Sequence, residues 1–129
     1  MSYRSLYWQK SDFDELVKKI KRNLSARFTR ACGTFRNENY LTHLGCSVEE
    51  LISHFSLSSK NLEYHHYGYG SNRGGWSKKE WEIDHIRPLS SFRLQYKYNR
   101  EKCFHYSNLQ ALPVRENRKK SSTYKGKHY

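Results

Sequence analysis

The chain has 129 residues, which is enough for one domain with a modest core and too few for two independent ones. Lys and Arg number 24 against 12 Asp and Glu, so the formal net charge at pH 7 is +12 and the expected partner is a polyanion, DNA or RNA. No apolar run approaches the roughly 20 residues that span a bilayer, and the first residues do not form a signal peptide. We therefore expect a cytoplasmic protein without a membrane partner.

The cysteines are few and lie in no CxxC motif, so the sequence supports neither a disulfide framework nor a zinc ribbon. Reduced and mostly buried thiols are the expected state in the cytoplasm. A zinc site is conceivable in principle, although the spacing of its ligands matches no common pattern. Its members would be Cys103, His105, His65 and His66.

Residues 11–28 are predicted to form an amphipathic helix with Ser11 as its N-cap. The apolar residues share one helical stripe: Phe13, Leu16, Val17, Ile20, Leu24 and Phe28. The other side is basic and carries Lys18, Lys19, Lys21 and Arg22. These cations either are solvated or contact nucleic-acid phosphates, and the pattern leaves both readings open.

A second helix is predicted over residues 47–55, where Ser47 and Glu50 have the spacing of a capping box. The stretch 30–40 between the two helices reads as a polar connection. Residues 61–76 have no periodicity and are rich in Gly, Asn, Tyr and His, which favours an ordered loop or an irregular hairpin.

The second half of the chain predicts a strand, a second strand and a short helix. Trp81 and Ile83 alternate with polar residues, and the strand ends at Asp84 and His85. The run 103–112 is strand-like, and a helix is predicted to start at Pro113. Asn117 and Lys120 on that helix are three residues apart and share a face.

This arrangement carries a resemblance. The string "IDHIRPLSSF…HYSNLQALPVRENRKK" resembles the motif of the HNH endonucleases, which have the ββα-metal fold. In that family a DH pair ends the first strand, an Asn lies on or after the second, and a His or Asn on the helix completes the site. Eight residues separate Asn108 from Asn117, as is usual in the family, whereas the gap from His85 to Asn108 is longer than in compact members. Because the last position is Asn117, the chain is similar to the H-N-N variant.

The resemblance implies an α+β fold in two parts. Residues 1–75 would be a helical N-terminal region with a basic, aromatic connecting loop. Residues 76–129 would be the ββα-metal core with a basic C-terminal tail. More loosely, residues 44–55 resemble the helical lead-in of small phage-associated HNH proteins.

The resemblance also assigns roles to the site residues. His85 would be the general base, because imidazole titrates near neutral pH and can accept a proton from water. Asp84 and Asn117 would hold one divalent ion through oxygen atoms, which suits Mg²⁺, or Mn²⁺ in its place. Asn108 would not touch the metal, and its amide would instead tie the loop backbone so that His85 points correctly.

The implied activity is metal-dependent cleavage of DNA, in particular double-stranded DNA, in a phage or mobile-element (homing-type) setting within a bacterial cell. Lys119 and Lys120 would contact phosphates or be solvated, and the role of Arg87 is open. The residues predicted to bind nucleic acid are Lys18, Lys19, Lys21, Arg22, Arg87, Arg118, Lys119 and Lys120. Two alternatives are a basic nucleic-acid-binding protein without catalysis and an RNA-directed nuclease. A monomer is favoured, with the oligomeric state left open.

Overall fold

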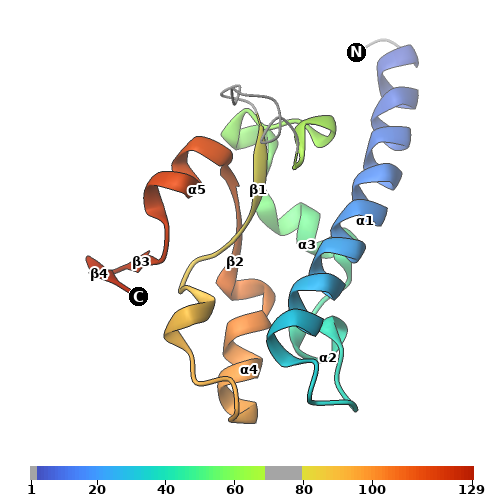
Figure 1. Ribbon diagram of the computed structural model, residues 1–129. Coiled ribbons are helices and arrows are strands. Elements are labelled where there is room, and N and C mark those ends of the chain that lie inside the picture. Colours follow the sequence, from blue (N-terminus) through green and yellow to red (C-terminus); the bar gives the residue numbers. More distant parts are fainter. Residues whose placement is uncertain (1–2, 69–79) are drawn as a thin grey trace.

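The computed structural model describes residues 3–68 and 80–129, and side chains from residue 10 onward. The described residues form a mixed α and β structure that is mostly helical, with two small two-stranded sheets. The elements are α1 Tyr3–Cys32, α2 Tyr40–Leu44, α3 Val48–Phe55, β1 Trp81–His85, α4 Lys97–Phe104, β2 Leu109–Pro113, α5 Val114–Lys120, β3 Thr123–Tyr124 and β4 Lys127–His128. In Figure 1, α1 and α5 lie on either side of the β1–β2 pair.

Helix α1 follows the predicted apolar stripe but starts earlier than predicted. Leu16, Ile20 and Leu24 are buried, as the periodicity indicates. The helix begins at Tyr3, so Ser11 lies inside it and the predicted N-cap is wrong. The reason is that no Pro or Gly between residues 3 and 11 interrupts the helical backbone.

The predicted capping box of the second helix is confirmed. The Ser47 hydroxyl accepts a hydrogen bond from the Glu50 backbone N–H, and the Glu50 carboxylate accepts one from the Ser47 N–H, both at 3.0 Å. These bonds satisfy two donors that the helix itself leaves unpaired. Helix α2 was not anticipated, because its five residues are too few to show a helical period.

The sheet pairs β1 with β2 in antiparallel register, which sets Asp84 opposite Gln110 and His85 opposite Leu109. The predicted second strand is wrong over its first half, because residues 103 and 104 end α4 and residues 106–108 form a 3₁₀ turn. Tertiary packing decides this point: Phe104 and Cys103 are buried against α1. Helix α5 starts at Val114, one residue later than predicted, and Pro113 occupies the N-cap position without a side-chain capping hydrogen bond.

The hydrophobic core is continuous from α1 to the sheet. Trp81 and Ile83 of β1 belong to the same buried cluster as Leu16 and Ile20 of α1. Trp81 also meets the ring of Phe55 edge-on at 6.1 Å. The helical N-terminal part therefore holds the start of β1 in place, and the β1–β2 pair does not form a separate core.

The basic C-terminal tail is ordered as a hairpin. Strands β3 and β4 pair around Lys125 and Gly126, whose φ angles are 49° and 78°. Two successive positive φ angles are typical of the tight turn that joins antiparallel strands. Within residues 3–68 and 80–129, none of the helices combines the length and apolar character needed to cross a membrane.

Candidate active site

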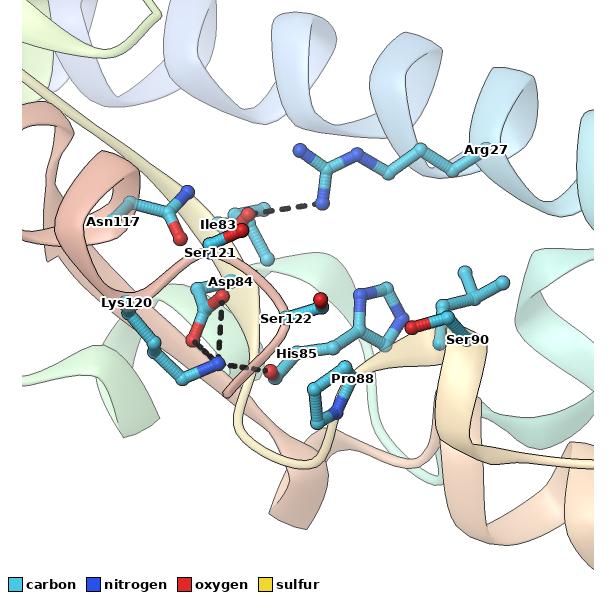
Figure 2. A pocket seen from close by; sticks show the side chains of 11 residues that line it. Arg27, Ile83, Asp84, His85, Pro88, Ser90, Asn117, Lys120, Ser121 and Ser122 are labelled. Atoms are coloured by element: carbon cyan, nitrogen blue, oxygen red, sulfur yellow. Dashed lines mark hydrogen bonds and ion pairs between the residues drawn. The ribbon is translucent and has the colours of Figure 1, made fainter. Parts of the chain in front are cut away.

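A pocket of about 400 Å³ opens where β1 ends. Three of the residues predicted to form the site, Asp84, His85 and Asn117, line it together (Figure 2). The remaining wall residues are Arg27, Ile83, Pro88, Leu89, Ser90, Lys120, Ser121 and Ser122. The pocket thus collects side chains from α1, β1, α5 and the loop after β1.

Two neighbouring strand residues reach one pocket because the chain leaves β geometry after His85. A regular strand sends successive side chains to opposite faces. Here His85 is the last residue of β1, and the backbone turns away through residues 86–88. The Ile86 N–H donates to the Asn108 carbonyl at 2.8 Å, which fixes the first residue of the turn.

The side chain of Asn108 holds this turn together. Its amide oxygen accepts from the Arg87 N–H at 2.9 Å, and its amide nitrogen donates to the carbonyls of Arg87 at 3.1 Å and Cys103 at 3.0 Å. Asn108 therefore ties the loop after β1 to the end of α4. It does not line the pocket of Asp84 and His85 but a neighbouring hollow of about 440 Å³.

Asp84 is buried, and its carboxylate has one polar and one cationic partner. Its carboxylate accepts from the Gln110 amide at 2.9 Å and forms an ion pair with the Lys120 ammonium at 3.3 Å. Lys120 also donates to the His85 carbonyl at 3.1 Å. Lys120 is thus directed into the pocket and not into solvent, although both positions are open to a residue at the end of a helix.

Asn117 presents its oxygen to the same region. Its amide nitrogen donates to the Glu82 carboxylate at 2.6 Å, which fixes the orientation of the amide. Figure 2 shows the amide oxygen turned toward the side of Asp84. One carboxylate and one amide oxygen are hard donors that suit Mg²⁺ or Mn²⁺. The two residues fit such an ion, which would take the position beside Asp84 that the Lys120 ammonium now holds.

The imidazole of His85 is shielded from bulk water. Its ring lies edge-on to Phe104 at 5.5 Å and is 8% exposed, and its Nε2 is buried with no hydrogen-bond partner among the described residues. Burial first, and then the charges of Arg27 and Lys120, lower the pKa of His85 to about 4. The imidazole is therefore neutral at pH 7, the form that can accept a proton.

Arg27 is a pocket residue that the sequence reasoning missed. It reaches across from α1 and donates from Nη1 to the Ile83 carbonyl at 2.9 Å (Figure 2). The only signal in the sequence is that Arg27 precedes the buried Phe28, at the edge of the apolar stripe. Together Arg27 and Lys120 place two positive charges on the pocket wall.

The other cations predicted to bind nucleic acid differ in their exposure and in their contacts. On α1 the exposed ones are Lys18, Lys21 and Arg22, whereas Lys19 is half-buried. Arg118 and Lys119 are exposed on α5. Arg87 is engaged in its own loop, because its guanidinium lies 4.1 Å from the Phe92 ring centre and donates from Nε to the Ser91 hydroxyl at 3.1 Å.

A different group, Glu63, His65 and His66, could also hold a metal ion. It lies apart from the pocket and does not include Cys103 or His105. The described residues therefore do not bring all four members of the zinc site suggested by the sequence together. Two of them, His65 and His66, belong to this group.

Comparisons of the chain with protein-family models, curated proteins and solved structures give no match. The resemblance to HNH endonucleases therefore rests on the quoted residues and their order along the chain.

Proposed function

We propose that this protein is a metal-dependent DNA endonuclease of the HNH type. The observation that carries the proposal is the meeting of Asp84, His85 and Asn117 around one pocket, on a β1–β2–α5 arrangement. A protein that only bound nucleic acid would have no need for a buried imidazole with an unpartnered nitrogen beside a buried carboxylate.

Each pocket residue has a task in hydrolysis of a phosphodiester bond. Neutral His85 would take a proton from the attacking water. Asp84 and Asn117 would hold Mg²⁺, which would supply positive charge to the phosphate and to the departing 3′ oxygen. Asn108 fixes the turn that follows His85, and Arg27 lies where it can contact a phosphate oxygen.

The proposal is tested by incubating the protein with supercoiled plasmid and genomic DNA, with Mg²⁺ or with a chelator. Using both substrates provides many sequences for an enzyme with a preferred site. Relaxed circles would indicate nicking, and linear plasmid would indicate double-strand cleavage. If neither DNA changes at any Mg²⁺ or Mn²⁺ concentration, the protein is better explained as a binding protein. Cleavage of RNA alone would favour the RNA-directed alternative.

DNA binding is expected to be strongly sensitive to salt and to persist without metal. The net charge is +12, and neutralising phosphates releases counterions. We expect the affinity for a DNA duplex to fall at least about tenfold between 50 and 200 mM salt. Fluorescence anisotropy at several salt concentrations, with chelator present, measures this change. Lys119→Ala should reduce by about one the slope of the logarithm of the binding constant against the logarithm of the salt concentration. Lys119→Arg should leave this slope unchanged. An affinity that is constant over this range contradicts the expectation.

Removing the Lys120 ammonium is expected to raise the affinity for metal. Lys120 pairs with the carboxylate proposed to hold the ion, at 3.3 Å, so the ion and the ammonium compete. Lys120→Met keeps the length of the side chain and removes the charge. A Mn²⁺ titration followed by electron paramagnetic resonance should show tighter binding than in the wild type. Lys119→Met, at an exposed position on the same helix, is the control and should bind Mn²⁺ as the wild type does. Equal affinities in all three proteins would remove Lys120 from the ion's surroundings.

A further inference from the structure

A short 3₁₀ turn, Tyr64–His66, gathers two imidazoles and a carboxylate that the nuclease proposal does not use. His65 Nε2 lies 3.3 Å and His66 Nδ1 lies 3.8 Å from the same oxygen of Glu63. One ligand atom from each of the three residues can be chosen so that all lie within 4.8 Å of one another. The turn follows α3 and lies beside the start of β1 (Figure 1).

These separations are close to those around one metal ion. Zinc binds imidazole nitrogen and carboxylate oxygen at about 2.0–2.2 Å, so two of its ligand atoms lie roughly 3.3 Å apart in tetrahedral geometry. The His65 Nε2–Glu63 distance of 3.3 Å has that value already, whereas the His66 Nδ1–Glu63 distance of 3.8 Å is wider. The side chains of Glu63 and His65 are 54% and 56% exposed, so they have room to rotate toward an ion.

The backbone of the turn is fixed by the core. Leu62 before it and Tyr67 after it are buried, with 6% and 3% exposure. The Trp81 indole N–H donates to the Glu63 carbonyl at 2.8 Å, and the Gly68 N–H donates to the Trp81 carbonyl at 2.8 Å. The backbone positions of the three residues are therefore fixed before an ion arrives, which reduces the entropy lost on binding.

The charges of the cluster also favour a cation shared by the three side chains. The rings of His65 and His66 are 4.1 Å apart, and both lie next to the Glu63 carboxylate. Two neutral imidazoles and one carboxylate would give a divalent ion three donor atoms and one compensating negative charge. Imidazole donors select zinc, cobalt or nickel rather than Mg²⁺, which prefers oxygen.

We propose that Glu63, His65 and His66 form a binding site for a zinc-type divalent ion. This site is independent of the proposed nuclease activity. Trp81 and His85 occupy opposite ends of β1, roughly 13 Å apart at the usual rise of a strand. Two ions that act together in catalysis lie about 4 Å apart, so the ion at Glu63 does not take part in cleavage. It clamps the turn at residues 63–66, and through Trp81 the start of β1.

Isothermal titration of the untagged full chain with Zn²⁺ tests the proposal. The protein is first stripped with chelator, and excess Mg²⁺ is kept present to occupy the pocket of Asp84. We expect one Zn²⁺ per chain with a micromolar dissociation constant, and a higher melting temperature with Zn²⁺ than without. His65→Ala and Glu63→Gln should each weaken binding at least about tenfold and abolish the shift in melting temperature.

Two control variants show where the ion binds. His128→Ala removes an exposed imidazole elsewhere, and Asp84→Asn removes the carboxylate of the pocket. Both should bind Zn²⁺ as the wild type does, whether or not the protein cleaves DNA. The proposal is overturned if Zn²⁺ shows no saturable binding below about 100 µM, if His65→Ala and Glu63→Gln bind like the wild type, or if only Asp84→Asn loses the ion.

Discussion

Replacing His85 with alanine is expected to lower the rate of DNA cleavage by about 10²-fold or more, the usual scale for loss of a positioned base. The proposed mechanism gives the imidazole no part in holding the metal or the DNA, so both affinities should stay close to those of the wild type. The variant keeps the Lys120 contact with the backbone carbonyl of residue 85. The loss should therefore be confined to the catalytic step and should not be rescued by raising the Mg²⁺ concentration.

Comparing His85→Ala with Asp84→Asn separates the role of the general base from that of the metal ligand. Removing the charged member of the proposed Asp84–Asn117 ligand pair should weaken metal binding itself, and excess Mn²⁺ should partly restore cleavage. His54→Ala, which alters an exposed imidazole outside the pocket, is the control for loss of a histidine. Cleavage, Mn²⁺ affinity and DNA affinity are measured for all three variants and the wild type, with circular dichroism to check the fold.

His85 is packed against Phe104, so alanine leaves a small cavity. His85→Gln retains more volume and still lacks the base, which makes it the second variant. Cleavage at the wild-type rate by a folded His85→Ala protein would refute the proposed mechanism, however closely the residues resemble the HNH motif.

Glu38→Gln is expected to destabilise the fold by about 3 kcal/mol at pH 7, because it removes one partner of a largely buried ion pair. The Glu38 carboxylate accepts from Arg100 Nε at 2.8 Å and from Nη2 at 3.0 Å, and from His43 Nε2 at 2.8 Å. Arg100 is 5% exposed and stacks on Phe35 with 3.6 Å from its Cζ to the ring centre. This network ties the loop before α2 to α4.

The contribution of Glu38 should depend on pH in a defined direction. The hydrogen bonds from Arg100, with a smaller effect from His43, lower the pKa of Glu38 from 4.5 to about 2. A carboxylate with a lowered pKa stabilises the folded state above its unfolded-state pKa, and the stabilisation is lost as the pH falls toward the folded-state value. The difference in unfolding free energy between the wild type and Glu38→Gln should therefore shrink between about pH 4.5 and pH 2.

Urea unfolding at a series of pH values measures this difference. Glu15→Gln removes an exposed carboxylate of α1 and should show no comparable pH-dependent loss. A difference between the wild type and Glu38→Gln that does not change from pH 7 to pH 2 would show that the pair is not the source of the acid sensitivity.

The sequence alone determined the features that depend on neighbours along the chain. The apolar stripe of α1 and the capping box at Ser47 follow from spacings of three and four residues, and both are present. The strand over residues 81–85 and the helix after Pro113 were also predictable, because alternation and a proline at the helix start are local signals. The site of Asp84, His85, Asn108 and Asn117 was predicted from the resemblance of their order to the HNH motif, and all of these except Asn108 line one pocket.

Only the tertiary structure decided the features that depend on residues distant in the sequence. Helix α4 replaced part of a predicted strand, because Cys103 and Phe104 gain more by packing against α1 than by pairing with a strand. Arg27 faces His85 across the pocket, although 57 residues separate them in the chain. The ammonium of Lys120 occupies the place beside Asp84 rather than solvent. These contacts depend on how the helices pack against one another, and the local spacing of residues does not predict them.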